Sequence, residues 1–543
     1  MTQTAPSPPA REGGSPAGAS APAREINWSP RVSAALLARL AARAAVAAPG
    51  EQMPVEAPFT GETLAEVPLG TPADVEAACA AARTAQSAWA RFPVQERAAV
   101  LMRCHDLVIA NAAEILDLVQ LESGKARIHA FEEVLDVAIQ ARYYAHAADG
   151  YLRAQRKQGA LPLLTSARVY HRPRGVIGII SPWNYPLTLA ISDALPALIA
   201  GNGVVLKPDA QTPLTALWAA VLLEEAGLPR GLLQVVTGRG STLGGPLIDA
   251  VDYMMFTGST AIGRTVAARC GEQLKDCSME LGGKNALLVL QDAPLRRAVP
   301  GALQGITSGS GQLCVSIERV YVHDAVYDAF VPRLVEALRA VRIGADLGFG
   351  VDMGSLASAD QLKKVSGHVA DAVSKGAEVL AGGKARPDLG PYFYEPTLLA
   401  GVDDGMEVCR AETFGPVAAV YRCSSTDEMI ALANDSEYGL NASIWTRDVT
   451  AGREIAARLQ SGTVNVNEAY AATWASAAPQ GGWKQSGLER RHGRHGLLKY
   501  TDPQTVAVQR ALIIGTPRFL SHGQYAAVMT TAVRLLKHVP GIK

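Results

Sequence analysis

The sequence predicts an α/β protein in which parallel sheets are covered by helices. Short apolar runs of strand length alternate with turns and helical segments along most of the chain. Of the 543 residues, 48% are hydrophobic and 19% are charged, so the chain can bury large cores. No run approaches the roughly 20 apolar residues that a membrane-spanning helix requires. Basic and acidic residues number 51 each, so a nucleic-acid partner is not expected.

The N-terminal region predicts a disordered tail followed by covering helices. Residues 1–30 are rich in Pro, Ala, Ser and Gly and lack the pattern of a secretory signal. Arginines such as Arg11 and Arg24 leave a transit peptide as the alternative. From Thr71 to Gly150, apolar residues recur three and four positions apart, which indicates helices.

Strand-sized runs that each lead into a turn and a helix begin after Val169. They are Gly175–Ser181, Gly203–Lys207, Leu233–Thr237, Tyr253–Thr257 and Ala286–Leu290. Alternating strands and helices form right-handed βαβ units, which build a parallel sheet covered on both faces. Ligands of such sheets bind beyond the carboxyl ends of the strands, so we expect the functional residues there.

A second α/β section is expected after Asn285. Its strand signals are Val320–His323, Thr397–Leu399, Gly415–Tyr421 and Ala442–Trp445, and its helical segments lie near Ala325–Val341 and Ala359–Lys375. Two α/β units of this size agree with the length of the chain.

A glycine turn from Gly258 to Gly263 ends one predicted strand and opens a helix. Backbone N–H groups and the helix dipole attract anions at such a turn, which predicts a phosphate site. Two alternatives remain open. The glycines can serve the tight turn alone. The segment also differs from a P-loop only at Arg264, where that motif has Lys, which leaves a nucleotide triphosphatase as a rival.

Cys314 is a candidate nucleophile among the seven cysteines, because a glycine- and serine-rich loop that starts at Ser308 precedes it. Backbone N–H groups can approach a side chain in such a loop, and Glu280 supplies a carboxylate that can act as a base. A small buried hydrophobic residue is the alternative for Cys314. The sparse cysteines form no C-x-x-C pair, which predicts a reducing compartment, the cytoplasm, and no metal site.

Five motifs together resemble the aldehyde dehydrogenase superfamily. They are Pro182–Pro186, Phe256–Ser259, Glu280–Lys284, Gly311–Cys314 and Glu412–Pro416, and they occur in the family's order and at similar separations. The resemblance covers about residues 55–508. It is strongest to bacterial NADP-dependent succinate-semialdehyde dehydrogenases with an extended C-terminus. It implies a Rossmann-type cofactor domain, a second α/β catalytic domain and a small β arm for oligomerisation.

The same resemblance implies domain boundaries. The cofactor domain takes residues 31–154 and 174–282, the catalytic domain 283–481, the oligomerisation strands 155–173 and 497–510, and a helical extension 511–543. The strands imply self-association as a homodimer or a dimer of dimers. The extension carries an apolar stripe from Tyr525 to Leu536, which we expect to pack on the body or dock on another subunit rather than on a membrane.

Four residues take catalytic roles by this resemblance. Cys314 attacks the aldehyde carbon, and the Asn184 amide and the backbone N–H of Cys314 hold the resulting oxyanion. Glu280 activates the water that hydrolyses the thioester. Lys284 tunes the site electrostatically. The product is a carboxylic acid, because the CoA-dependent branch of the family lacks the carboxylate of Glu280.

The resemblance also implies contacts to the dinucleotide. Lys207 contacts the adenosine ribose, Ser259 and Trp183 contact the phosphates, Glu412 contacts the nicotinamide ribose, and Phe414 packs near the nicotinamide. The remaining residues of this predicted site are Gly258, Gly263 and Leu281.

The choice between NADP and NAD is predicted from one loop. NAD-preferring relatives usually carry Glu at the position of Ala210, where it repels a 2′-phosphate, and Arg239 can pair with that phosphate. Asp209 disfavours NADP, because a carboxylate beside the 2′-phosphate repels it. We expect NADP to be preferred and NAD to be tolerated.

The substrate is less well determined. Well-known succinate-semialdehyde enzymes bind the substrate carboxylate with arginines at the positions of Ser192 and Ser308, so Ser486 or backbone amides would have to replace them. The alternative substrate is a medium-chain or aromatic aldehyde, and a non-catalytic oligomeric scaffold is a remote alternative. The cavity walls implied by family position are apolar or aromatic: Tyr185, Leu189, Leu313, Val315, Tyr470 and Trp474.

Overall fold

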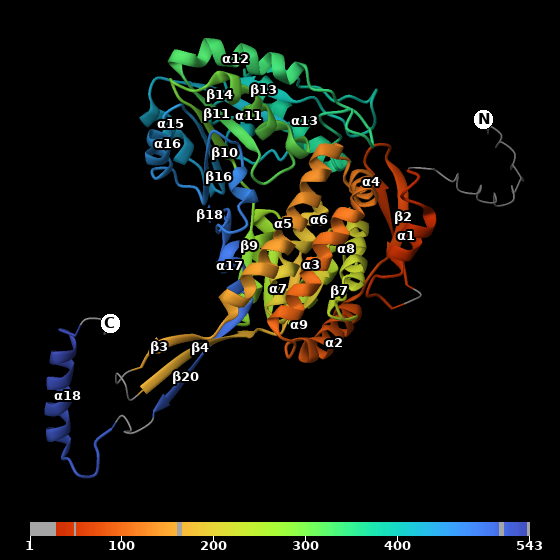
Figure 1. Ribbon diagram of the computed structural model, residues 1–543. Helices are drawn as coiled ribbons and strands as arrows, with labels where there is room; N and C mark the ends of the chain where they lie inside the picture. Colours follow the sequence, from red (N-terminus) through yellow and green to blue (C-terminus); the bar gives the residue numbers. More distant parts are fainter. Residues whose placement is uncertain (1–28, 48–49, 160–164, 510–514, 540–543) are drawn as a thin grey trace, which may run out of the picture.

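The computed structural model describes residues 29–47, 50–159, 165–509 and 515–539 (Figure 1). The tail predicted over residues 1–30 lies outside the described residues, apart from its last two positions. Of these, Ser29 is buried and its hydroxyl donates to the Asp117 carboxylate at 2.5 Å. At these two positions the structure therefore differs from the predicted tail, because Ser29 is fixed on the body.

A six-stranded sheet forms the centre of the first unit. Its order is β19-β9-β8-β5-β6-β7. The strands are β5 (Val176–Ile180), β6 (Gly203–Lys207), β7 (Leu233–Val235), β8 (Tyr253–Thr257), β9 (Cys277–Glu280) and β19 (Gly487–Leu488). The first five are parallel, and only the edge strand β19 is antiparallel. A parallel sheet was predicted, but its fifth strand is β9 and not the run Ala286–Leu290, which belongs to the second sheet. The carboxyl ends of β5, β6, β8 and β9 therefore lie along one edge.

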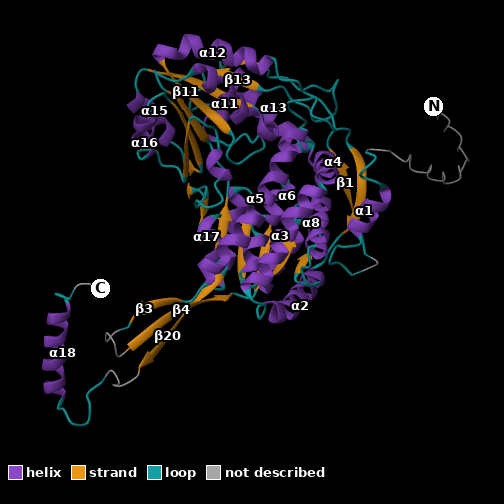
Figure 2. Ribbon diagram, viewed as in Figure 1, coloured by secondary structure: helices purple, strands orange, loops and turns teal. Residues whose placement is uncertain are grey.

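Helices cover both faces of this sheet (Figure 2). Alternation along each strand sends Val176 and Val205 into one apolar core and Ile177 and Val204 into another. The first core is closed by α2 (Pro72–Trp89), α9 (Gly240–Ala250) and α10 (Thr260–Glu272). The second is closed by α3 (Val94–Ala110), α4 (Ala112–Ser123), α5 (Arg127–Leu152), α6 (Pro186–Ile191), α7 (Ala194–Ile199) and α8 (Pro213–Glu225). The predicted helical region 71–150 is confirmed.

A small N-terminal layer was not anticipated from the sequence. It consists of α1 (Ala34–Ala41) and a hairpin of β1 (Gln52–Ala57) with β2 (Glu62–Pro68). Exposed and buried residues alternate along β1, which is the period of a half-buried strand. Helix α1 begins at Ser33, whose side chain accepts the N–H of Leu36, and it buries three leucines against the second core.

The second unit contains a seven-stranded sheet in the order β12-β13-β14-β11-β10-β16-β17. Its strands are β10 (Asn285–Val289), β11 (Ile317–His323), β12 (Glu378–Ala381), β13 (Thr397–Ala400), β14 (Val417–Cys423), β16 (Asn441–Trp445) and β17 (Thr463–Val466). All are parallel except β12. Its helices include α11 (Leu295–Thr307), α12 (Asp324–Arg339), α13 (Ala359–Ser374), α14 (Glu407–Arg410), α15 (Thr426–Asn434) and α16 (Val449–Ala456). The predicted second α/β section is confirmed.

A three-stranded antiparallel arm projects from the body (Figure 1). It contains β3 (Gln155–Gln158), β4 (Thr165–Pro173) and β20 (Thr501–Gln509), with β4 in the middle. Two apolar side chains of β20, Val506 and Val508, are exposed. The last strand of the arm, β20, starts at Thr501 and not at residue 497 as predicted. Leu497, on α17 (Gly493–Leu498), and Tyr500 are instead fully buried in the body.

The C-terminal extension forms α18 (His522–Leu536), which begins with a capping box between Ser521 and Gln524. None of its residues is buried, so this helix does not pack on the body of its own chain, and docking on another subunit stays a prediction. Val528, Val533 and Leu535 are each more than half exposed. Within the described ranges, no helix is both long and apolar enough to cross a membrane.

Candidate active site

Cys314 follows α11 and a short 3₁₀ turn, η1 (Ser308–Gly311). Gly309, Ser310 and Gly311 all have positive φ, which turns the chain sharply before the cysteine. At Gly311 a Cβ atom would lie 2.1 Å from the carbonyl oxygen of Gly415, so this position requires glycine. Packing against the Gly415 backbone therefore fixes the loop that presents the thiol.

Two cavities meet at Cys314. The inner cavity has a volume of about 90 Å³ and the outer cleft about 230 Å³. Asn184, Leu189 and Cys314 line both. A molecule in the inner cavity and another in the outer cleft would thus meet at the sulfur atom.

Asn184 is held rigidly in the loop between β5 and α6. Its backbone carbonyl accepts from the buried ammonium of Lys125 at 2.6 Å, and its side-chain Nδ2 donates to the carbonyl of Gln312 at 2.8 Å. Lys125 is itself paired with Glu133 at 2.6 Å. The Asn184 amide keeps a second N–H, so it can donate to an oxyanion beside Cys314.

Glu280 ends β9 and lines the outer cleft. It is only 5% exposed, and its Oε1 accepts no hydrogen bond from the residues described. Burial raises the pKa of its carboxyl to about 7, and neighbouring cations act against this rise. A carboxyl with this pKa can take up a proton near neutral pH.

The Cys314 side chain is partly buried, and its thiolate form is electrostatically disfavoured. Burial, with smaller contributions from Glu280 and Glu412, raises its pKa to about 12. Arg491 acts in the opposite direction. Attack by this sulfur therefore requires removal of a proton or a change in the nearby charges when the site is filled.

The outer cleft has the groups that a dinucleotide needs. Glu412 places its Oε1 2.8 Å from the N–H of Gly283, and burial raises its pKa to about 7. Trp183 and Phe414 meet edge to face at 5.5 Å. Ser259 is the N-cap residue of α10, and its side chain accepts the N–H of Ile262. This end of the helix lies at the cleft, where free N–H groups can bind an anion. The sequence-predicted residues Trp183, Gly258, Ser259, Leu281, Glu412 and Phe414 all line the cleft.

Other predicted cofactor residues lie outside the cleft lining. Lys207 is buried and donates to the carbonyls of Pro208 and Gly238 at 2.5 and 3.2 Å. Arg239, next to Gly238, is exposed, so its guanidinium is free to reach a ligand near Lys207. Ala210 packs partly on the helical core. Gly263 has a packing role, because a Cβ there would lie 2.4 Å from Leu281.

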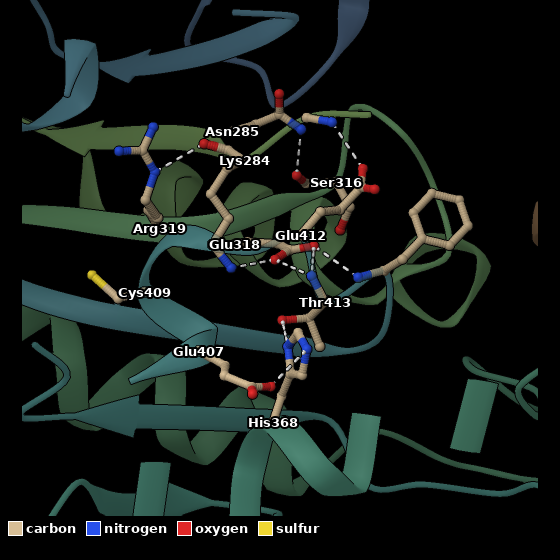
Figure 3. A network of polar contacts seen from close by, with 12 residues as sticks. Lys284, Asn285, Ser316, Glu318, Arg319, His368, Glu407, Cys409, Glu412 and Thr413 are labelled. Carbon is tan, nitrogen blue, oxygen red and sulfur yellow. Dashed lines mark hydrogen bonds and ion pairs between the residues drawn. The ribbon is translucent and has the colours of Figure 1, made fainter. Parts of the chain in front are cut away.

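Lys284 lines neither cavity, so the electrostatic role predicted for it can only be indirect, through neighbours such as Glu412. Figure 3 shows its ammonium on Glu318, at 2.5 Å, in a fully buried ion pair. Glu318 in turn accepts the backbone N–H groups of Thr413 and Phe414. Lys284 therefore supports the loop that carries Glu412 and Phe414 (Figure 3).

The inner cavity contains most of the predicted substrate residues. Those that line it are Tyr185, Leu189, Ser192, Leu313, Val315, Tyr470 and Trp474. Two predictions are wrong. Ser486 is fully buried elsewhere, where its hydroxyl accepts the N–H of Gly439 at 3.0 Å. Ser308 lies behind the lining and its hydroxyl shares a hydrogen bond with Tyr470 at 2.6 Å.

The lining is also more polar than predicted. The residues that sequence reasoning missed are Glu132, Asp136, Thr188, Thr473, Gln480, Arg491 and His492. Tyr470 and Tyr185 donate to Glu132 at 3.2 and 3.3 Å, and Ser192 donates to Asp136 at 2.6 Å. Glu132 and Asp136 lie four residues apart on α5, so this spacing was the available signal. The exposed surface of the cavity is nevertheless mainly apolar, as predicted, and the missed residues add polar groups to it.

Comparisons with known proteins agree on the family. A sequence model described as the aldehyde dehydrogenase family matches residues 45–506. A Mycolicibacterium smegmatis protein with the provisional name succinate-semialdehyde dehydrogenase [NADP(+)] is 52% identical over 90% of this chain and 95% of its own length. A glutarate-semialdehyde dehydrogenase of Pseudomonas aeruginosa is 40% identical over 83% of this chain and 93% of its own.

Solved structures show the same similarity. An NADP-dependent enzyme of E. coli superposes with a TM-score of 0.81 at 36% identity, over 84% of this chain and 95% of that one. An aldehyde dehydrogenase of Bacillus cereus in complex with NAD+ superposes with a TM-score of 0.80 at 35% identity, over 84% of this chain and 93% of that one.

Proposed function

The chain belongs to the aldehyde dehydrogenase family, and we propose that it oxidises a short aldehyde to the carboxylic acid through a thioester on Cys314, with NADP as the preferred cofactor. The observation that carries this proposal is the position of Cys314 where the inner cavity and the outer cleft meet. The aldehyde takes the inner cavity and the nicotinamide end of the cofactor takes the outer cleft.

The first half of the reaction forms a bond between Cys314 Sγ and the aldehyde carbon. The carbonyl oxygen becomes an oxyanion, which the Asn184 amide and the Cys314 backbone N–H stabilise. Each such donor contributes about 3 to 4 kcal/mol in comparable sites. Bound NADP supplies a hydride acceptor, and loss of hydride from the hemithioacetal leaves a thioester.

Glu280 is the general base of the second half. It removes a proton from the water that attacks the thioester carbon, and Cys314 leaves as the carboxylic acid forms. Its pKa of about 7 and its place in the outer cleft, beside Cys314, support this role.

Preference for NADP rests on the loop after β6, which contains Ala210, and on the turn after β7, which contains Arg239. Ala210 has no carboxylate to repel a 2′-phosphate, and exposed Arg239 follows Gly238, whose carbonyl accepts from Lys207. The names of the M. smegmatis relative and of the E. coli enzyme include NADP, which supports the same choice.

A short semialdehyde is the proposed substrate. The M. smegmatis and P. aeruginosa relatives carry the names of succinate- and glutarate-semialdehyde dehydrogenases, and an inner cavity of about 90 Å³ suits a short chain. One observation favours an uncharged aldehyde instead. The cavity contains the carboxyl groups of Glu132 and Asp136, and its one arginine, Arg491, is already paired with Asp193 at 2.6 Å.

The test is the rate of reduced-cofactor formation with NADP and with NAD. The aldehydes are succinate semialdehyde, glutarate semialdehyde, butanal and an aromatic aldehyde. A higher kcat/KM for a semialdehyde than for butanal supports the first substrate class, and the reverse supports the second. Absence of activity with every aldehyde would refute the proposed function.

We extend the proposal to assembly and location. The exposed strand β20 of the arm supports self-association as a homodimer or a dimer of dimers. The seven cysteines are free, which fits a reducing compartment such as the cytoplasm.

A further inference from the structure

The carboxyl group of Glu280 lies under a short pair of backbone segments. A Cβ built on Gly481 would be 3.1 Å from Glu280 Oε1, so the Gly481 backbone covers this oxygen. Gln480, its neighbour, forms an isolated antiparallel bridge with Arg491 through two hydrogen bonds of 3.0 and 2.7 Å. This bridge brings Arg491 to the wall that covers Glu280, and both Arg491 and Cys314 line the inner cavity.

Arg491 is buried and has one ionic partner. It is 7% exposed, and within the described ranges its guanidinium forms one ion pair, with Asp193 Oδ2 at 2.6 Å. The other oxygen of Asp193 accepts from Tyr500 at 3.0 Å and lies 3.3 Å from the ammonium of Lys499. Two cations thus share one carboxylate, which leaves one positive charge to be balanced in a buried place.

This ionic cluster faces the same side of β9 as Glu280. Lys499 also donates to the Ser278 hydroxyl at 3.1 Å. Ser278 and Glu280 are two residues apart on a strand, so their side chains point to the same face. After Asp193, the carboxyl group with the largest charge effect on Arg491 is that of Glu280, which lines the outer cleft with Cys314.

Two other charged groups lie near this site. Arg490 donates to the backbone carbonyls of Gly482 and Glu489 and has a smaller effect on Glu280 than Arg491 has. Asp136 accepts from Ser192 at 2.6 Å, and its charge acts on Arg491 less than that of Glu280 does. Arg491 has the largest charge effect on the pKa of Glu280, followed by Lys499, and both lower it, whereas Asp193 raises it. The geometry and the charges thus single out the same residue.

We propose that Arg491, held in place by Asp193, is a positioning residue for the general base and supplies the positive charge that balances the Glu280 carboxylate during thioester hydrolysis. This inference rests on the proposed function. Arg491 exchanges no proton and forms no bond with the substrate. Its effect is on the fraction of Glu280 that is ionised and on the direction in which the carboxylate points.

The test is the pH dependence of acyl-enzyme hydrolysis, measured after the burst of reduced cofactor with the best aldehyde of the substrate panel. Removal of the cation in Arg491→Gln moves the acidic limb of this rate to higher pH by about one unit or more, because an opposite charge within reach lowers a carboxyl pKa by about that amount. At pH values well below the midpoint of the acidic limb, the hydrolysis rate of Arg491→Gln is then about tenfold lower than that of wild type. Arg491→Lys keeps the positive charge, so its acidic limb lies at the same pH as that of wild type.

A second variant gives a shift of opposite sign, which a merely structural role would not produce. Asp193→Asn removes the anion and leaves both cations, so the acidic limb moves to lower pH. The matched control is Arg494→Gln, an exposed arginine three residues away, which leaves the limb in place.

Three outcomes would overturn the inference: an unshifted limb in Arg491→Gln, no restoration by Arg491→Lys, or an upward or absent shift in Asp193→Asn. If Arg491→Gln does not fold, the Arg491→Lys and Asp193→Asn results decide alone. Failure of the proposed function is distinct, because wild type would then reduce no cofactor with any aldehyde.

Discussion

Replacement of Glu280 by Gln separates the two halves of the reaction. The side chain is 5% exposed and its Oε1 has no hydrogen-bond partner among the described residues, so the isosteric amide fits without breaking a hydrogen bond to that oxygen. We therefore expect Glu280→Gln to fold and to bind cofactor as wild type does. Formation of the thioester needs Cys314 and Asn184, so one equivalent of reduced cofactor per site still appears in a burst.

Steady-state turnover should then fall by about 10² to 10⁴, because a positioned general base contributes that factor. Stopped-flow absorbance of the reduced nicotinamide measures the burst and the later rate, and mass spectrometry detects the trapped acyl group on Cys314. In wild type, a carboxyl pKa of about 7 means that hydrolysis rises with pH up to about 7 and then levels, since only the ionised form accepts the proton. A steady-state rate equal to that of wild type in Glu280→Gln would remove this residue from the hydrolytic step.

Three further changes test other parts of the site. Cys314→Ala should abolish aldehyde oxidation and leave NADP binding unchanged in a fluorescence titration, and residual turnover would exclude Cys314 as the nucleophile. Ala210→Glu should lower the ratio of kcat/KM for NADP to that for NAD by about tenfold or more, because a carboxylate near a 2′-phosphate is repulsive; an unchanged ratio would place the phosphate elsewhere. Glu318→Gln breaks the fully buried pair with Lys284, which should cost about 3 to 5 kcal/mol of stability. Denaturant unfolding measures this loss, and a loss below about 1 kcal/mol would show that the pair does not support the Glu412 loop.

The parts of the fold that follow a local pattern were predicted well. Strands such as β6 and β8 are continuous apolar runs because both of their faces are buried, and their bounds agree with the prediction. The hairpin of β1 and β2 was missed because its alternation of exposed and buried residues is short and includes a proline at position 54. Of the two expectations for α18, packing on the body is not what the structure shows, since an apolar stripe indicates that a helix has a face to bury but not what covers that face.

In the candidate site, too, the residues within motifs were predicted and the contacts of their side chains were not. Cys314, Glu280 and Asn184 were identified from motifs, and the structure places Cys314 and Asn184 at the junction of the two cavities and Glu280 in the outer cleft. Lys284 was placed with them because it shares a motif with Glu280, but successive strand and loop residues point in different directions, and its side chain turns to Glu318.

The sequence by itself determined the fold class and the family, and it named the candidate nucleophile and general base, because each depends on residues close together in the chain or on motifs in a set order. Only the tertiary structure decided which charges meet in and behind the inner cavity. Glu132 and Asp136 come from α5, Asp193 from the start of α7 and Arg491 from the segment before α17, and these positions are separated by up to 359 residues. Electrostatic interactions depend on distance in space and on burial, and neither can be read from separation along the chain.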